Sequence, residues 1–155
     1  MNNSSFVAIA EVSYAPRAVV LNSYANSDDN DRLVLLIEGS LEIVGQDNRV
    51  IAGEVLPSKS AGFVGDVSFL ERLYVSQRRR RRRRPLSPPL PSPAISPSAT
   101  VLSGPSGSRC VVFSGPELRR LMDGNDRYDV AVRAVLTLGL QRKLREMMLD
   151  PGGKV

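Results

Sequence analysis

The apolar residues of the first seventy positions fall into short runs rich in valine, isoleucine and leucine. Polar clusters such as NSYANSDDNDR (22–32) and GQDNR (45–49) separate these runs. Short β-branched runs between turn-forming residues are typical of strands. Segment 32–45 therefore predicts two strands, or one strand bent at Gly39, and segment 48–56 predicts the next strand after a hairpin loop at 45–48.

The pattern becomes helical towards the end of the chain. In SGPELRRLMDGND (114–126), a serine or glycine cap, a proline near the first helical position and Glu117 in the first turn favour a helix that ends at Gly124. From 126 to 150, apolar residues recur at helical spacing and predict a long amphipathic helix. Its apolar face comprises Val132, Val135, Leu136, Leu140, Leu144 and Met147 or Met148, and the opposite face carries Arg133, Arg142, Lys143 and Arg145.

Between these regions lies a segment that is incompatible with a packed core. Seven consecutive arginines (78–84) precede PLSPPLPSPAISPS (85–98), in which six of the fourteen residues are proline. Proline lacks an amide donor and adjacent like charges repel, so we expect 78–98 to be a disordered insert. ATVLSGPSGSRCVVF (99–113) then predicts two strands around an SGPSGS turn. The expected organisation is one domain formed by 1–77 and 99–150, interrupted by this insert.

Composition limits the size of the domain and its chemistry. A chain of 155 residues with 42% hydrophobic and 5% aromatic residues has room for one modest aliphatic core. No run could span a bilayer and no signal peptide is evident, so we expect a cytoplasmic protein, with a nuclear or partner-mediated membrane location left open. The sequence has one cysteine, Cys110, and no histidine, which excludes an internal disulfide, Cys/His zinc sites and histidine-dependent hydrolases. We therefore expect neither an enzyme nor a metal site, and a core position for Cys110.

The net charge of +5 originates in the arginine run, because removing those seven charges leaves −2 for the rest of the chain. Clustered cations bind phosphate backbones without base contacts, so any affinity for nucleic acid or acidic partners is expected to reside in this run. A run without aromatic residues gives only weak support for nucleic-acid binding.

Segment AGFVGDVSFL (61–70) has Gly65–Asp66 at the centre of a mostly apolar stretch. A turn between strands, a strand bulge and a small anion-binding loop all fit this pattern, because glycine reaches positive φ at no steric cost. In an anion-binding loop, Gly65 would let the chain approach the ligand closely. The amides of Asp66, Val67 and Ser68 would then converge on the oxygens of a phosphate.

The order of these segments resembles the cyclic nucleotide-binding domain. LLIEGSLEI (35–43) resembles the family's strand that ends in a glycine, and FVGDVSFL (63–70) resembles its phosphate-binding cassette F-G-E-x-x-x-L with one additional residue before the glycine. Ala99-Thr100-Val101 matches a later A-T-V strand, and 116–122 and 135–147 are similar to the B and C helices. The resemblance covers 31–148 without the insert, and its later part also resembles the Popeye group. It implies a mainly β fold, a β-roll (jelly roll) of eight strands with C-terminal helices.

For function, the resemblance implies a regulatory or sensor module rather than an enzyme. The ligand, cAMP or cGMP, would contact Gly65, Asp66, Val67, Ser68, Ala99 and Thr100, with Asp66 accepting the ribose 2′-hydroxyl in place of the family's glutamate. Ligand binding would then reposition the C-terminal helix.

One family residue is missing. The arginine that pairs with the phosphate falls at Ser96-Pro97-Ser98, and losing such a charged hydrogen bond costs about 1.5–3 kcal/mol, or roughly tenfold to more than a hundredfold in affinity. Nucleotide binding is therefore predicted to be weakened or lost. The alternative is a scaffold without a ligand, in which the insert contacts acidic partners or nucleic acid. A homodimer through Leu136, Leu140 and Leu144 is compatible with both alternatives.

Overall fold

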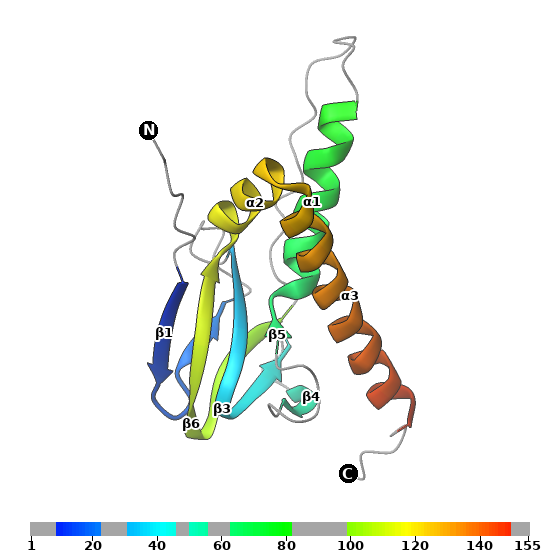
Figure 1. Cartoon of the computed structure of the whole chain (residues 1–155). Helices are drawn as coiled ribbons and strands as arrows, with labels where there is room; N and C mark the ends of the chain where they lie inside the picture. Colours follow the sequence, from blue (N-terminus) through cyan, green and yellow to red (C-terminus); the bar gives the residue numbers. More distant parts are fainter. Residues whose placement is uncertain (1–8, 23–30, 46–49, 56–62, 82–98, 150–155) are drawn as a thin grey trace, which may run out of the picture.

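The computed structural model describes residues 9–22, 31–45, 50–55, 63–81 and 99–149 (Figure 1). Strands dominate the first part of the chain, and two helices close it, as the sequence predicted. The elements in chain order are β1 (Ile9–Tyr14), β2 (Val19–Leu21), β3 (Arg32–Val44), β4 (Val50–Val55), β5 (Phe63–Val64), α1 (Asp66–Arg81), β6 (Thr100–Ser114), α2 (Gly115–Gly124) and α3 (Asp126–Leu149).

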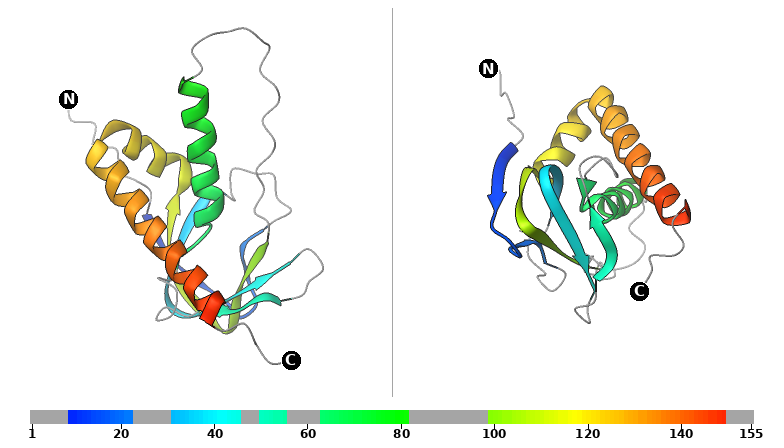
Figure 2. Two further views of the ribbon diagram at one scale, coloured as in Figure 1. Left: turned by 90° about the vertical axis from the view of Figure 1, so that its right-hand side faces the viewer. Right: turned by 90° about the horizontal axis from the view of Figure 1, so that it is seen from below.

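The two long strands β3 and β6 form the centre of the antiparallel sheet. They pair from Arg32↔Ser114 to Val44↔Thr100, within the order β1-β6-β3-β4, and β2 and β5 attach to β6 and β3 respectively. Both strands have a glycine with positive φ, Gly39 at 85° and Gly107 at 82°, in the region where their register shifts. A Cβ atom on Gly39 would lie 2.3 Å from the Gly107 carbonyl oxygen. The strands therefore bend together here, and the sheet curls (Figure 2).

The observed bounds of these two long strands test two of the sequence predictions. Segment 32–44 is one strand bent at Gly39, which was one of the two expected forms. The prediction of two strands around an SGPSGS turn was wrong, because β6 continues through these residues. Pairing on either side of 104–107 keeps the strand continuous, since β3 pairs with residues before and after them, β2 with residues before them and β1 with residues after them. Most of the predicted hairpin loop, 46–48, lies outside the described residues.

Two apolar clusters hold the fold together. The first lies on the sheet and includes Cys110, whose exposure of 0% confirms its predicted core position. The second joins the sheet to the helices, and one member from each helix shows this: Phe69 of α1, Leu118 of α2 and Leu136 of α3. The helices are thus fixed to the sheet mainly by burial of aliphatic and aromatic side chains.

The two C-terminal helices follow the sequence prediction in extent, but α3 differs in its buried face. Helix α2 has Ser114 at its N-cap, a proline in its first turn and its end at Gly124. On α3, Leu136 is 1% exposed, whereas Val135, Leu144 and Met148 are 49%, 59% and 79% exposed. The predicted broad apolar face is therefore wrong, because the sheet and the other helices contact only one narrow side of α3 (Figure 1).

A helix of the length of α1 was not expected from the sequence. Helix α1 continues to Arg81, so Arg78–Arg81 are helical, whereas the sequence analysis placed them in a disordered insert. Buried Phe69 and Leu73 anchor its first turns, arginine has a high helix propensity, and cations are favourable at a helix C-terminus. The remainder of the expected insert, 82–98, lies outside the described residues. Within the described parts, no helix is both long and apolar enough to span a membrane.

Candidate functional site

Gly65 lies at the junction between β5 and α1. Its φ of 82° takes the chain from the strand into the helix, and a Cβ atom there would lie 2.4 Å from the Arg32 carbonyl oxygen, so this position requires glycine. Helix α1 begins directly afterwards, and the Phe69 amide donates to the Gly65 carbonyl oxygen at 3.0 Å. The Gly65–Asp66 pair is therefore neither a turn between strands nor a bulge. It forms a strand-to-helix loop, at which the first amides of α1 lack helical acceptors and favour an anion.

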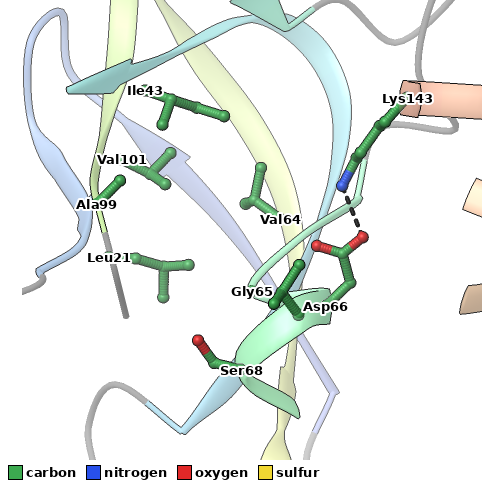
Figure 3. Close-up of a pocket in the computed structure, with 10 residues that line it drawn as sticks. Leu21, Ile43, Val64, Gly65, Asp66, Ser68, Ala99, Val101 and Lys143 are labelled. Carbon is green, nitrogen blue, oxygen red and sulfur yellow. Dashed lines mark hydrogen bonds and ion pairs between the residues drawn. The ribbon is translucent and has the colours of Figure 1, made fainter. Parts of the chain in front are cut away.

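A pocket of about 130 Å³ opens beside this loop (Figure 3). Of the predicted site residues, the structure brings five together in its lining, and Thr100 is not among the lining residues. The lining consists of the predicted Gly65, Asp66, Val67, Ser68 and Ala99, together with Leu21, Ile43, Val64, Val101 and Lys143. The pocket thus combines a mostly apolar wall with one helix N-terminus and one pair of opposite charges.

That charge pair joins the loop to the last helix. The Lys143 ammonium of α3 donates to the Asp66 carboxylate at 2.7 Å and to the Phe63 carbonyl oxygen at 2.5 Å. The Asp66 side chain is 5% exposed and the Lys143 side chain 22%. Figure 3 shows the carboxylate directed towards Lys143 and away from the apolar side chains. In this structure, the group expected to accept a ribose hydroxyl is therefore already bound by α3.

Lys143 is the site residue that the sequence analysis missed. It was assigned to the polar face of the last helix, although it follows Leu136 by seven residues and therefore shares its side. The sequence gives no signal for this position, because the burial of Leu136 is seen only in the structure. The positions expected to correspond to the family's arginine, 96–98, lie outside the described residues. Among the described lining residues, Lys143 is the one with a positive charge.

A second buried carboxylate lies near the other end of the helix interface. Asp31 is 5% exposed. Its carboxylate accepts hydrogen bonds from both terminal nitrogens of Arg119 on α2, and one of these bonds is 2.9 Å long. Arg72 of α1 lies 3.4 Å from the same carboxylate, and the Gly115 amide donates to the Asp31 carbonyl oxygen at 2.7 Å. The Arg119 guanidinium also lies 5.7 Å from the ring centroid of Phe69. Asp31 thus connects the beginning of β3 to α1 and α2, which positions the helices around the pocket.

Other reactive groups give no sign of chemistry. Burial raises the pKa of the Cys110 thiol, more than its contact with Ser108 lowers it, so this group stays protonated at neutral pH. In the parts of the chain that the structure describes, no cluster of three or more His, Cys, Asp or Glu side chains could hold a metal ion.

Comparisons with known proteins identify the fold. No family model matches the sequence, and no curated protein is significantly similar to it. A protein from Geobacter metallireducens GS-15 assigned to cyclic nucleotide binding aligns with a TM-score of 0.58 and 16% identity over 88% of this chain and 79% of that chain. The sensor domain of the transcriptional regulator DNR from Pseudomonas aeruginosa aligns with a TM-score of 0.50 and 16% identity over 90% of this chain and 74% of that chain.

These alignments confirm the predicted fold class. The chain has the mainly antiparallel β-roll with C-terminal helices that cyclic nucleotide-binding domains have, and the described residues supply six of its strands. Membership of the Popeye group stays a prediction. At 16% identity the similarity establishes architecture, so function has to be argued from the pocket itself.

Proposed function

We propose that this chain is a non-enzymatic regulatory or sensor module of the cyclic nucleotide-binding type, in which occupancy of the Gly65 loop changes the position of α3. The observation that carries this proposal is the contact between Asp66 and Lys143. It joins the loop suited to an anionic ligand directly to the terminal helix. A ligand whose affinity for the loop differs between two positions of α3 shifts the equilibrium towards the position that it binds more tightly.

The proposed ligand is cAMP or cGMP, bound weakly. The pocket volume of about 130 Å³ is below the roughly 300–1,000 Å³ of ordinary small-molecule sites, so a nucleotide has to open the pocket to enter. Opening has to separate Asp66 from Lys143 if Asp66 is to accept a ribose hydroxyl. Both requirements reduce the affinity, which agrees with the loss expected from the missing arginine.

Isothermal titration calorimetry with cAMP, cGMP and 5′-AMP tests this proposal. We expect a saturable one-to-one signal for a cyclic nucleotide and none for 5′-AMP. Ser68→Trp places an indole in the pocket and should abolish the signal, and exposed Leu138→Trp on α3 serves as the matched control. Absence of heat from the wild-type protein at millimolar cyclic nucleotide would contradict the ligand assignment and leave the scaffold alternative.

A specific surface supports a protein-interaction role for α3. Six exposed positions repeat with the alternating four- and three-residue spacing of a coiled-coil seam: Val130, Ala134, Thr137, Gln141, Leu144 and Met148. Such a seam is self-complementary about a two-fold axis, and a single polar residue such as Gln141 sets its register. We therefore propose a homodimer through this stripe. The earlier expectation of Leu136, Leu140 and Leu144 is corrected, since Leu136 is buried and Leu140 half-buried.

Sedimentation equilibrium tests the dimer. We expect Leu144→Glu to convert a dimer into a monomer, because it places two like charges in the seam. Val135→Glu is the matched control, since Val135 is exposed on another side of α3. A wild-type monomer at high concentration, or equal effects of the two substitutions, would exclude this interface.

A further inference from the structure

Helix α1 extends well beyond the pocket at which it begins. Its first turns are buried through Phe69 and Leu73. Its far end projects past α2 and α3 and away from the sheet, in both Figure 1 and the left view of Figure 2. Residues Arg78–Arg81 form the last described turn of this projection. The beginning of the arginine run is therefore presented on a helix that is fixed to the core, which the sequence did not predict.

The charge density of this turn matches that of a nucleic acid. Successive helical residues are about 100° apart and rise about 1.5 Å, so four arginine positions surround the axis at one cation per roughly 1.5 Å. A single strand carries one phosphate charge per roughly 3.4 Å, so the cations of this turn are spaced at least as closely as the phosphates they would contact. An arginine on every side leaves no apolar face, which a helix lying in a membrane surface requires. The rest of the chain has a net charge of −2, so the net positive charge of the protein originates in this run.

An exposed aromatic residue lies next to the basic turn. Tyr74 of α1 is 64% exposed. It precedes Arg78 by four residues and Arg81 by seven, so the three positions share one side of the helix. Aromatic side chains beside a basic track stack on unpaired bases in proteins that bind single strands without sequence preference. The sequence alone showed a run without aromatics, and the helix supplies the missing stacking residue.

We propose that the projecting half of α1, residues 74–81, binds single-stranded nucleic acid. The ring of Tyr74 stacks on a base, and the arginine turn contacts the flanking phosphates as fork-shaped donors. Binding depends on charge and stacking, so it varies little with sequence and strongly with salt. This inference concerns a surface outside the pocket and does not rest on the ligand proposed for it.

The experiment compares the affinity of the protein for three partners: single-stranded oligonucleotides, a duplex of equal length and phosphatidylserine vesicles. Fluorescence anisotropy of labelled oligonucleotides measures the first two, and anisotropy of the labelled protein measures binding to vesicles. One variant changes Arg78–Arg81 to glutamine, which retains helix propensity. Its matched control changes four exposed arginines elsewhere, Arg120, Arg127, Arg142 and Arg145, and therefore has the same net charge. We expect at least tenfold weaker single-strand binding for the first variant and less than threefold for the control. The slope of log K against log salt should become shallower by about 0.7 for each of these arginines that contacts a phosphate, which is about 1.4 for the two on the side of Tyr74 and at most about 2.8.

Substitutions at Tyr74 distinguish the contribution of base stacking to binding from the contribution of the arginine charges. Tyr74→Ala should weaken single-strand binding about fivefold or more and leave duplex binding unchanged, whereas Tyr74→Phe should bind as the wild type does. Tyr128→Ala on α3, where Tyr128 is 49% exposed, is the control for loss of an exposed aromatic. Equal losses in the two glutamine variants would overturn the proposal. So would wild-type affinity of Tyr74→Ala for single strands, or tighter binding to vesicles than to oligonucleotides.

Discussion

Replacing Lys143 with methionine tests whether α3 is held to the pocket loop by a charged contact. Methionine preserves the length and helix propensity of the side chain and removes only the ammonium group. The Asp66 carboxylate, 5% exposed, then lacks its cation, and the Phe63 carbonyl oxygen loses a donor. The variant should therefore lower the free energy of unfolding and loosen the end of α3 that carries the lysine.

The burial of the two side chains sets the magnitude. Removing one partner of a fully buried ion pair costs about 3–5 kcal/mol, and exposed pairs contribute only about 0–1 kcal/mol. With Lys143 at 22% and Asp66 at 5% exposure, Lys143→Met should cost about 2–3 kcal/mol, between these limits. Asp66→Asn should cost only about 1 kcal/mol, because the lysine can still reach water. The double variant should resemble the more destabilised single variant, which gives a coupling energy of about 1 kcal/mol, equal to the cost of Asp66→Asn alone.

Urea denaturation of the four proteins, analysed with a shared m value, measures this coupling. Hydrogen exchange should show faster exchange at the C-terminal turns of α3 in Lys143→Met, with α2 unchanged. Arg142→Met is the matched control, since Arg142 is exposed and adjacent, and it should change stability by less than about 0.5 kcal/mol. Additive single variants, or a Lys143→Met stability equal to that of the control, would refute the reasoning.

Three further predictions follow from glycine geometry, the buried thiol and the second carboxylate. Gly65→Ala should cost about 1–3 kcal/mol in thermal or urea unfolding, whereas Gly124→Ala, whose Cβ meets nothing within 4 Å, should be neutral or slightly stabilising. Cys110 should react with Ellman's reagent only after unfolding. Because burial raises the pKa of its thiol, the free energy of unfolding should fall as the pH rises past 9.0, and this fall should be smaller in Cys110→Val. Asp31→Asn should cost about 2 kcal/mol, because it weakens the contacts of two partly exposed guanidinium groups at once, and Asp129→Asn in an i,i+4 pair should cost only about 0.3–0.5 kcal/mol. Equal effects within either pair of variants, or rapid thiol modification of the folded protein, would contradict the corresponding argument.

Features with local signals were predictable from the sequence. The start and end of α2 follow from a proline, an acidic residue and Gly124, which act within a few residues of the helix. The bend of β3 at Gly39 and the loop at Gly65 follow from glycines that adopt positive φ. Five of the six predicted site residues share one pocket, because the resemblance placed them on segments that the fold brings together.

Contacts between distant segments were not predictable in this way. Lys143 reaches Asp66 across 77 residues and Arg119 reaches Asp31 across 88, and neither pair has a signature in its local sequence. The continuity of β6 depends on pairing with β3 before and after 104–107, and the glycine, serine and proline residues there carry no local signal of that pairing. Helix α1 was missed because repulsion between arginines was weighed more heavily than anchoring of its first turns in the core.

The two buried carboxylates hold α1 to its neighbouring helices with unequal strength. Asp31 binds the α2 arginine through two nitrogens and also attracts Arg72, with its side chain 4% exposed. The link to α3 is a single ammonium, whereas two guanidinium groups contact Asp31, and this makes the link to α3 the weaker of the two. A ligand that displaces the Gly65 loop should therefore break the contact between Asp66 and Lys143 first. If so, saturating ligand should increase hydrogen exchange around Lys143 and leave α2 protected, and faster exchange in α2 alone would show that the displacement passes through Asp31 instead.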